Sequence, residues 1–375
     1  MRFSGTHTEH VTVDAAAARA IRRRLLAWFD RHARDLPWRR RSEDPYAQLL
    51  AELMLHQTQV VTVVPYYERF IARFPTVNAL AAGDLDEILA MWSGLGYYRR
   101  ARHLHAAAQK IVADFGGQVP RTVEALMTLP GVGRYTAGAV ASIAFDVRAP
   151  ILDGNVMRVL ARLFADAGDP ASPKVQRRMW ARAEALLPHR RCGAFNQALM
   201  DLGGAPCVPV GPNCPACPLA PHCAARTKGL TERIPPVRRR AKVQATEVTV
   251  AALRYGERLL FVQRPADGLW AGLWELPTEP VGNGESPADA RARLRKRLPR
   301  GTRLATQANH LVTRLLSHRR VTFHVFEGHL GSGGAPGAIG DGEGSRWAAR
   351  NELGRLGVSR ACTAILARIG WLKQH

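Results

Sequence analysis

Four of the six cysteines are crowded into residues 207–223 and have a spacing suited to metal chemistry. Cys207, Cys214, Cys217 and Cys223 form the pattern Cys-x6-Cys-x2-Cys-x5-Cys. Thiolates this close in sequence can converge on one metal centre without a large fold around them. Structural zinc is the main alternative to an iron–sulfur cluster, although zinc ribbons usually carry two separated C-x2-C pairs. The spacing predicts a metal centre in a reducing compartment rather than a disulfide framework.

Two carboxylates stand where helical patterns place them near other polar residues. Glu52 lies at the edge of the apolar stripe made by Leu49 and Leu53, where a solvated flank is the simplest alternative. Asp153 directly precedes a helix-like run over residues 155–164 and is well placed to act as its N-cap. An N-cap position also keeps a carboxylate ionised, so a structural and a chemical role are compatible there.

A short loop, LPGVGRYTA at residues 129–137, has two glycines just before a helix-like run. Without side chains at Gly131 and Gly133, backbone N–H groups and the helix N-terminus can meet a phosphate. A simple helix connector is the alternative interpretation of such a loop. Tyr135 follows directly and places a phenol, rather than a stronger nucleophile, at the start of the helix.

The elements that must position these residues change character along the chain. From about residue 15 to residue 205, apolar residues recur at helical spacing, which predicts an all-α domain. After the cysteines, short strand-like runs alternate with glycine-containing turns, which predicts an α+β domain. Residues 330–344 are glycine-rich and are expected to form a mobile loop. The predicted helices are residues 17–29, 45–55, 101–115, 155–164, 177–187 and 288–298, and the predicted strands are residues 249–255, 258–264 and 321–330.

The chain of 375 residues has a formal net charge of +22, and both halves are basic. A polyanion that contacts both halves explains this charge, and nucleic acid is the usual candidate. The alternative explanation of the positive charge is an organism whose proteins are generally rich in arginine. No apolar signal segment or membrane-length run occurs, so we expect a prokaryotic cytoplasmic protein that DNA binding holds at the nucleoid. We also expect a monomer.

The motifs together resemble a known superfamily. The cysteine loop after a helical domain resembles the 4Fe–4S loop of endonuclease III-like DNA glycosylases, and LPGVGRYTA resembles their helix-hairpin-helix motif, which grips the DNA backbone. The similarity covers most of residues 20–225 and is specific to adenine DNA glycosylases of the MutY type. The segments that carry it are LPWR at residues 36–39, AELMLHQTQ at 51–59, GLGYYRRAR at 94–102 and ILDGNVMRVLAR at 151–162.

This resemblance implies catalytic roles for three residues. Glu52 aligns with the acid that protonates adenine and then helps to activate water. Asp153 aligns with the carboxylate that stabilises the sugar cation. Tyr135 stands where the lyase branch carries a lysine that attacks the sugar, and a phenol cannot form an imine. The resemblance therefore implies a monofunctional glycosylase that leaves an abasic site.

The resemblance also implies contacts with DNA. The target base must be flipped out of the duplex, and residues that match Gln57 and Tyr97 fill the gap. Arg34 and Trp38 match residues of the adenine pocket, and Asn155 belongs to the same matching segment as Asp153. Tyr97 and Trp38 could equally be core aromatics.

The second domain, from residue 247 to 375, resembles a Nudix-type domain. A Nudix hydrolase needs a helix dense in glutamate to hold magnesium, but here the matching segment is crowded with arginine, which excludes pyrophosphohydrolase activity. In the family this domain recognises 8-oxoguanine opposite adenine, and Ser317 and His318 match the residues that contact the lesion. A polar hairpin turn is the alternative. Two positions depart from the family, His56, where relatives carry glutamine, and Leu316, where they carry an aromatic residue.

The sequence thus predicts a helix-hairpin-helix glycosylase domain over residues 1–226, including the 4Fe–4S loop, a basic linker over 227–246 and a Nudix-like domain over 247–375. The predicted activity is excision of adenine paired with 8-oxoguanine or guanine. Two rival functions remain open at this point. One is a bifunctional glycosylase and lyase acting on oxidised pyrimidines, and the other is a catalytically silent lesion-binding protein.

Overall fold

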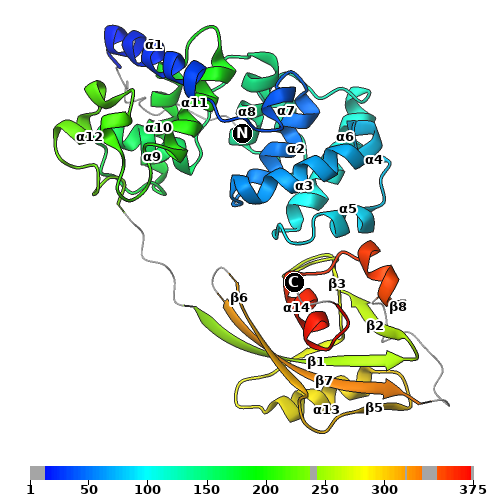
Figure 1. Ribbon diagram of the computed structural model, residues 1–375. Coiled ribbons are helices and arrows are strands. Elements are labelled where there is room, and N and C mark those ends of the chain that lie inside the picture. The colour runs from blue at the N-terminus through cyan, green and yellow to red at the C-terminus, as the bar shows by residue number, and fades with distance from the viewer. Residues whose placement is uncertain (1–12, 237–242, 317–318, 332–343, 373–375) are drawn as a thin grey trace, which may run out of the picture. The chain divides into compact units, whose positions relative to one another are not determined.

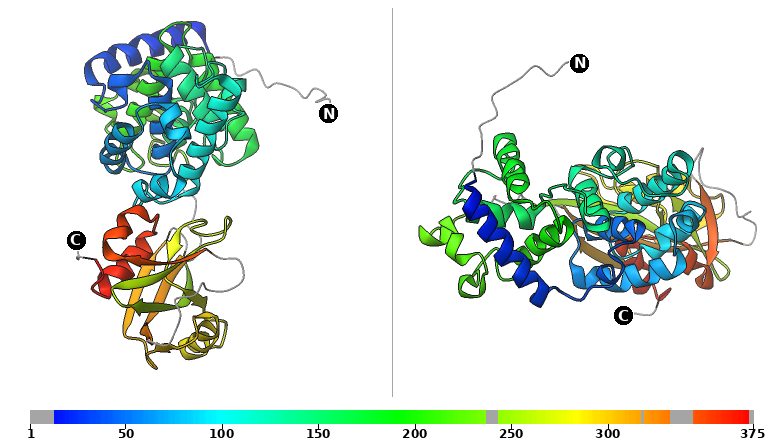
Figure 2. Two further views of the ribbon diagram at one scale, coloured as in Figure 1. Left: turned by 90° about the vertical axis from the view of Figure 1, so that its right-hand side faces the viewer. Right: turned by 90° about the horizontal axis from the view of Figure 1, so that it is seen from above.

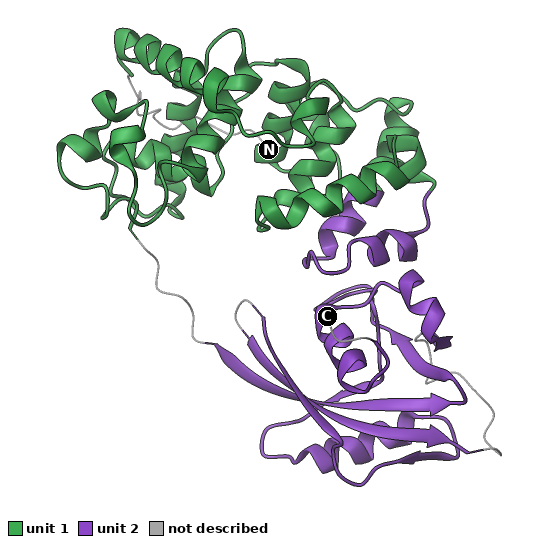
Figure 3. Cartoon of the chain, viewed as in Figure 1, with its two compact units in different colours: residues 1–82, 106–239 green, residues 83–105, 240–375 purple. Residues whose placement is uncertain are grey.

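The computed structural model divides by its internal contacts into two units (Figure 3). Unit 1 comprises residues 1–82 and 106–239, and unit 2 comprises residues 83–105 and 240–375. The structure describes residues 13–236, 243–316, 319–331 and 344–372.

Residues 83–105 belong to unit 2, although the sequence pattern joins them to the helical half. The hydroxyl groups of Ser93 and Tyr98 both donate hydrogen bonds to the carbonyl oxygen of Val358, at 2.8 and 2.9 Å. These bonds link chain segments that are far apart in sequence. The domain boundaries at residues 226 and 247 stay a prediction.

Unit 1 is helical, and its core is organised around helix α8 (Figure 1). Residues 136–142 of this helix are all buried. Helix α8 packs against α2 and α11, and α11 packs in turn against α1 and α9. The helices that lie in unit 1, wholly or in part, are α1 (Ala15–His32), α2 (Pro45–Leu55), α3 (Val60–Arg73), α4 (Val77–Ala81), α6 (Arg99–Phe115), α7 (Val123–Leu126), α8 (Arg134–Phe145), α9 (Gly154–Leu163), α10 (Pro173–Leu186), α11 (Cys192–Gly204) and α12 (Ala224–Thr227), with short 3-10 turns η1 (Arg39–Arg41), η2 (Cys214–Ala216) and η3 (Ala220–His222).

Local sequence signals fix where the central helices begin. Asp44 caps α2, because its side chain accepts hydrogen bonds from the N–H groups of Tyr46 and Ala47 at 3.0 and 3.1 Å. Pro45 occupies the first turn of α2, where no N–H is needed. Gly133 is the N-cap of α8. Tyr135 therefore lies in the first turn of α8, whereas Glu52 lies near the end of α2.

Unit 2 contains a mixed sheet in the order β3-β2-β1-β7-β5. The central strands β1 and β7 are parallel, and their register runs from Gln244 opposite Arg319 to Arg254 opposite His329. All the other pairs of named strands in the sheet are antiparallel. The elements of unit 2 are α5 (Leu85–Met91), β1 (Gln244–Tyr255), β2 (Arg258–Gln263), β3 (Trp274–Glu275), β4 (Thr278–Pro280), α13 (Pro287–Arg297), β5 (Thr302–Leu304), β6 (His310–Leu315), β7 (Arg319–Leu330), β8 (Ser345–Ala349), η4 (Arg350–Arg355) and α14 (Arg360–Arg368), together with the start of α6.

The sheet of unit 2 is covered on both faces by helices. Alternate residues of a strand point to opposite faces, so Val250 of β1 packs in a core with α14, whereas Ala251 packs in a second core with Leu294 of α13. The left view of Figure 2 shows α13 and α14 on opposite sides of the sheet. The predicted α+β class of this half is therefore confirmed.

The predicted elements agree with the observed ones. The run at 45–55 coincides with α2, and the other predicted helical runs fall on α1, α6, α9, α10 and α13. Strand β1 begins at Gln244, earlier than predicted, because parallel pairing with β7 extends the ladder past the apolar run. Most of the glycine-rich stretch, residues 332–343, lies outside the described residues, as do residues 1–12. Among the described residues, no helix is both long and apolar enough to span a membrane.

Candidate active site

Glu52 is buried inside α2, a helix whose residues from Tyr46 to Met54 are all buried. The residue is only 4% exposed, and among the described residues its Oε2 atom has no hydrogen-bond partner. The pKa of Glu52 is raised to about 7, chiefly by burial and further by the negative charge of Asp153, while a hydrogen bond from Tyr135 and the positive charge of Arg39 oppose the shift. A carboxyl in this environment can carry a proton near neutral pH, as a general acid requires.

Tyr135 lies in the first turn of α8 and borders the same space. Its hydroxyl group donates a hydrogen bond to the sulfur atom of Met200 at 3.4 Å. Burial, followed by the negative charges of Glu52 and Asp153, raises the pKa of Tyr135 well above its ordinary value. The side chain is therefore a neutral phenol at physiological pH, able to donate a proton in a hydrogen bond but not to act as an anion.

Asp153 is the N-cap of α9, as its place in the sequence predicts. Its Oδ1 atom accepts a hydrogen bond from the N–H of Val156 at 2.7 Å. Burial nevertheless raises the pKa of Asp153, while the N–H groups of Val156 and Asn155 and the positive charge of Arg158 oppose that effect. An N-cap alone would keep this carboxylate ionised. Here burial has the larger effect on the pKa, because the low-dielectric surroundings disfavour the charged form.

These three side chains line one cavity of about 960 Å³ in unit 1. The cavity is large enough for a nucleoside, because small-molecule sites in proteins usually occupy roughly 300–1,000 Å³. Six of the residues with predicted roles line it, namely Arg34, Glu52, Gln57, Tyr135, Asp153 and Asn155. His56 also lines it, and its Nε2 atom is 3.0 Å from the hydroxyl of Thr136.

A buried carboxylate holds Arg34 at this cavity. Asp201 is 3% exposed and accepts hydrogen bonds from Nε of Arg34 and Nη1 of Arg39, each at 2.7 Å. Two guanidinium groups on one carboxylate satisfy its acceptor sites and fix the direction of both arginines. The side chain of Arg34 remains 44% exposed. Sequence analysis missed Asp201, because the contact spans residues that are far apart in the chain.

Arg158 was also missed, although it lines the cavity. Its guanidinium donates hydrogen bonds to Oδ1 of Asn155 at 2.8 Å and to the carbonyl oxygens of Gly203 and Cys207 at 2.6 and 2.9 Å. It therefore connects the helix that Asp153 caps with the start of the cysteine loop. The available signal was its spacing, three residues after Asn155 and four before Arg162, which places it on the polar side of an amphipathic helix.

The other predicted binding residues lie elsewhere. Trp38 is buried and does not line the cavity. Its ring is edge-on to that of Tyr67, with the ring centroids 5.4 Å apart. Tyr97 belongs to unit 2, where it is 51% exposed and has a left-handed backbone with φ of 49°. Gln57, which lines the cavity, has a similar φ of 57°. For non-glycine residues this conformation is costly and is concentrated at functional sites.

The glycines of the 129–137 loop precede α8 and are exposed. Gly131 has φ of 77°, which a residue with a side chain rarely adopts. A side chain at Gly133 would meet nothing within 4 Å, so the space before the helix is open. Ser317 and His318 lie outside the described residues, between β6 and β7.

The four predicted metal ligands line one cavity together with Arg162 of α9. Nη1 of Arg162 donates to the sulfur atom of Cys207 at 3.4 Å. Burial raises the pKa of Cys217 to about 11 and also raises that of Cys223. Among the described residues, no three His, Cys, Asp or Glu side chains are grouped closely enough to hold a single ion. Four thiols around a common cavity, Cys214 among them, suit an iron–sulfur cluster, in which each thiolate binds a different iron atom.

Comparison with known proteins gives the family. Residues 50–185 match the family model of HhH-GPD superfamily base excision DNA repair proteins, and residues 249–368 match that of the NUDIX domain. The adenine DNA glycosylase of Homo sapiens is 37% identical over 412 residues, which cover 94% of this chain and 74% of that protein. The chain belongs to the adenine DNA glycosylase family.

Further comparisons agree with this assignment. The adenine DNA glycosylase of Mycobacterium tuberculosis (strain CDC 1551 / Oshkosh) is 42% identical over 247 residues, which cover 65% of this chain and 78% of that protein. The solved structure of a thermostable thymine-DNA glycosylase is 32% identical to this chain, with a TM-score of 0.52. The alignment covers 57% of this chain and 100% of that glycosylase. The resemblance to adenine DNA glycosylases and the predicted two-domain fold class are therefore confirmed.

The burial of the Glu52 carboxyl leads to a prediction about stability. Its pKa in the folded state, about 7, lies above the ordinary value of 4.5. Such a group contributes stability that is fully present below pH 4.5 and is lost as the pH rises through 7. Glu52→Gln removes the ionisation, so the free energy of unfolding of the variant, relative to that of the wild type, should rise by about 3 kcal/mol between about pH 4 and pH 8. Urea unfolding at a series of pH values measures this difference.

Glu68→Gln, at an exposed position of α3, serves as the matched control and should follow the wild type at every pH. Only the pH dependence is diagnostic, because a buried amide also changes stability in a way that does not vary with pH. Parallel profiles for Glu52→Gln and the wild type would show that the carboxyl does not hold its proton.

Proposed function

We propose that this protein removes adenine that lies opposite 8-oxoguanine or guanine in duplex DNA and leaves an abasic site with the strand intact. The observation that carries the proposal is the Glu52 carboxyl, buried at the nucleoside-sized cavity with a pKa raised to about 7. The family membership supports adenine as the base. The net charge of +22 supports DNA as the polymer.

The first chemical step is proton transfer to the base. Adenine is a poor leaving group unless a ring nitrogen is protonated, so the neutral carboxyl of Glu52 donates its proton. The electron pair of the glycosidic bond then leaves with the base. Glu52, now a carboxylate, accepts a proton from the water that adds to the sugar carbon. The net reaction consumes one water and returns Glu52 to its protonated form.

The second requirement is a negative charge beside the sugar. Loss of the base leaves an oxocarbenium-like sugar, and the carboxylate of Asp153 stabilises its positive charge. The N–H groups of Val156 and Asn155 and the charge of Arg158 favour ionisation of Asp153. Glu52 lacks such a set of partners at its Oε2 atom. The two acids therefore have environments suited to different protonation states.

Tyr135 keeps the reaction hydrolytic. A lyase needs an amine that attacks the sugar and forms an imine, and the cavity presents a phenol at this position. The neutral hydroxyl group instead lies near Glu52, where it moderates the pKa of that acid.

Several residues are proposed to hold the DNA. Arg34, fixed by Asp201, reaches the flipped adenine, and Gln57 enters the gap in the duplex. Phosphates bind at Gly131 and Gly133, where the open N-terminus of α8 presents its N–H groups. The roles of Trp38, Tyr97 and Asn155 rest on the family resemblance.

The Nudix-like half is proposed to recognise the base opposite adenine, through contacts of Ser317 and His318. The support is the position of these residues in the sequence, between two strands of the sheet. The carboxylates near α13 are paired with arginines, because Glu279 bonds Arg293 and Arg297 at 3.1 and 3.0 Å. This pairing favours recognition over magnesium-dependent hydrolysis.

Cys207, Cys214, Cys217 and Cys223 are proposed to hold a 4Fe–4S cluster. When bound, the cluster cross-links the loop that carries these residues and anchors it as a rigid element. Arg162 and Arg158, which contact Cys207, then tie this loop to α9.

Single-turnover excision tests the proposed function. A labelled duplex with adenine opposite 8-oxoguanine, guanine or thymine is incubated with enzyme, with and without alkali. Product is expected only after alkali, fastest opposite 8-oxoguanine and slowest opposite thymine. Glu52→Gln should lower the rate by about 10²–10⁴-fold, because it removes the general acid, and should still bind the duplex. Tyr135→Lys should add strand cleavage without alkali.

Glu68→Gln again serves as the control and should excise at the wild-type rate. Strand cleavage by the wild type without alkali would contradict the monofunctional assignment. Tight binding of the duplex without any excision would instead leave a silent lesion-binding protein as the function.

The cluster proposal predicts the metal content. The purified protein should contain about four iron and four sulfide per chain, and Cys214→Ala should lose most of both because one thiolate ligand is missing. Cys192→Ala is the control, since Cys192 is buried and bonds the carbonyl of Pro188. Elemental analysis for iron, zinc and acid-labile sulfide measures the outcome. Stoichiometric zinc without iron would contradict the proposal.

A further inference from the structure

The loop between α5 and α6, which carries Tyr97, contains three residues with a left-handed backbone. The φ angle is 102° at Gly94, 74° at Gly96 and 49° at Tyr97. Glycine adopts this conformation at little cost, whereas Tyr97 must be held in it by its surroundings. The side chain of Tyr97 is nevertheless 51% exposed. A constrained backbone beneath an exposed ring suits a residue that must project in one direction.

Two buried side chains hold the backbone of this loop. Nε1 of Trp92 and Nη2 of Arg100 each donate a hydrogen bond to the carbonyl oxygen of Gly96 at 3.1 Å. The guanidinium carbon of Arg100 lies 5.5 Å from the centroid of the Trp92 ring and 5.6 Å from that of the Tyr97 ring. Such cation–π contacts restrict where the Tyr97 ring can lie. The direction of Tyr97 therefore depends on the placement of the whole loop.

The same loop is anchored to the Nudix-like half at one carbonyl group. The hydroxyl groups of Ser93 and Tyr98 donate to the carbonyl oxygen of Val358 at 2.8 and 2.9 Å. A carbonyl oxygen has two lone pairs, so it can accept both bonds. The hydroxyl of Tyr98 also accepts a hydrogen bond from the N–H of Gly94 at 3.4 Å. Ser93 and Tyr98 flank the loop, so both of its ends are fastened to the same point.

Val358 is a fixed point because its neighbours belong to the framework of the sheet. It forms an isolated parallel bridge with Trp274 of β3, whose N–H donates to the carbonyl oxygen of Gly357 at 2.8 Å. The indole N–H of Trp274 donates to Oδ2 of Asp86 in α5 at 3.2 Å. A Cβ atom at Gly357 would lie only 2.6 Å from Cβ of Leu89. Helix α5 thus packs directly on the backbone beside Val358.

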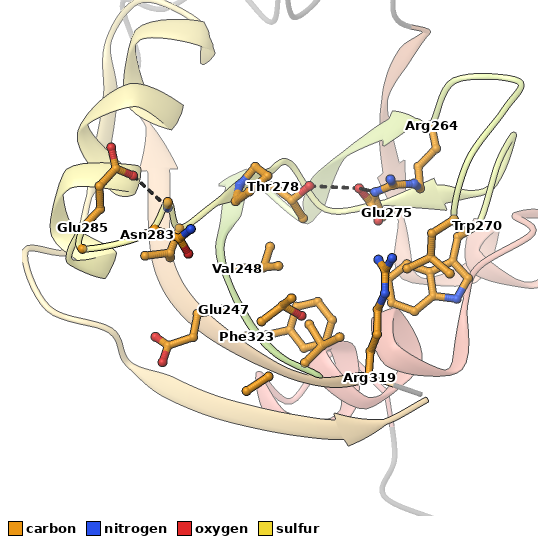
Figure 4. A pocket seen from close by; sticks show the side chains of 18 residues that line it. Glu247, Val248, Arg264, Trp270, Glu275, Thr278, Asn283, Glu285, Arg319 and Phe323 are labelled. Atoms are coloured by element: carbon orange, nitrogen blue, oxygen red, sulfur yellow. Dashed lines mark hydrogen bonds and ion pairs between the residues drawn. The ribbon is translucent and has the colours of Figure 1, made fainter. Parts of the chain in front are cut away.

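A second contact fastens the first turn of α6. Nη1 of Arg102 donates a hydrogen bond to the carbonyl oxygen of Ala271. The preceding residue, Trp270, borders the cavity shown in Figure 4. All of these contacts lie within unit 2 (Figure 3). The segment that carries Tyr97 is therefore docked on the Nudix-like half at two places.

We propose that Tyr98 is a positioning residue, which fixes the direction of Tyr97 by hydrogen bonding to the carbonyl of Val358. The Nudix-like half thereby places the ring that fills the gap left by the flipped adenine. This inference rests on the proposed function, because it concerns the step in which the base leaves the duplex. Tyr98 is 5% exposed and acts on the DNA only through Tyr97. Without the bond the ring would sample other directions, and extrusion of the base would become less favourable.

A double-mutant cycle on single-turnover excision of adenine opposite 8-oxoguanine tests the proposal. Tyr97→Ala should lower the rate by about tenfold or more, because the extruded base is no longer replaced. Tyr98→Phe removes only the hydroxyl and should lower the rate by about three- to tenfold, as expected for one hydrogen bond. Added to Tyr97→Ala, it should have no further effect, because both residues act through one ring. Ser93→Ala should have a smaller effect, since the bond from Tyr98 remains.

A second readout follows the base rather than the reaction. The target adenine is replaced by 2-aminopurine, whose fluorescence rises when it leaves the base stack. Glu52→Gln is the background, so that the base stays attached to the sugar. Binding of this protein should raise the fluorescence, and addition of Tyr98→Phe should reduce the rise by about three- to tenfold.

Tyr46→Phe is the matched control. Tyr46 is a buried residue of unit 1 whose hydroxyl donates to the carbonyl oxygen of Phe74 at 2.8 Å, so this variant loses a comparable bond away from the loop. It should excise adenine at the wild-type rate.

Three results would overturn the proposal. They are a wild-type rate in Tyr98→Phe, a wild-type rate in Tyr97→Ala, and losses from the two changes that multiply in the double variant, because Tyr98 would then act independently of Tyr97. A wild-type protein that excises no adenine would instead refute the proposed function. The fluorescence measurement would still decide the role of Tyr98 in that case.

Discussion

The carboxyl of Glu52 is enclosed by protein, and one of its oxygens receives no hydrogen bond in the described structure. An ionised carboxylate in such a place is costly, so the group keeps its proton to an unusually high pH. The fold must supply the enclosure, and it does so by burying α2 on nearly all sides against neighbours that include α8. The proton required for the chemistry is thus a consequence of helix packing.

The second acid shows how the same burial can be moderated. Asp153 is also buried, but the end of α9 offers it backbone N–H groups, and Arg158 adds a positive charge. Arg158 is itself held by carbonyl oxygens, one of which belongs to Cys207. The helix start, the cysteine loop and the carboxylate beside the sugar therefore form one connected framework. A change in the loop would therefore reach Asp153 through the side chain of Arg158.

Sequence reasoning succeeds where the signal is local. The helical run over residues 45–55 predicts α2, and Asp153 is found as the N-cap that its position predicts. It fails where contacts join distant segments. The clamp of Asp201 on Arg34 and the grouping of residues 83–105 with the sheet both arise from tertiary packing, which composition and periodicity do not encode.

The protonation state of Glu52 in the free protein tests the central claim most directly. Carbon-13 labelling of glutamate side chains allows each carboxyl to be followed by NMR through a pH titration, and the signal absent from Glu52→Gln identifies the residue. We predict that this signal titrates with a midpoint of about 7. A midpoint near the ordinary value of 4.5 would contradict the account, because Glu52 would then be ionised at neutral pH and could not supply the proton.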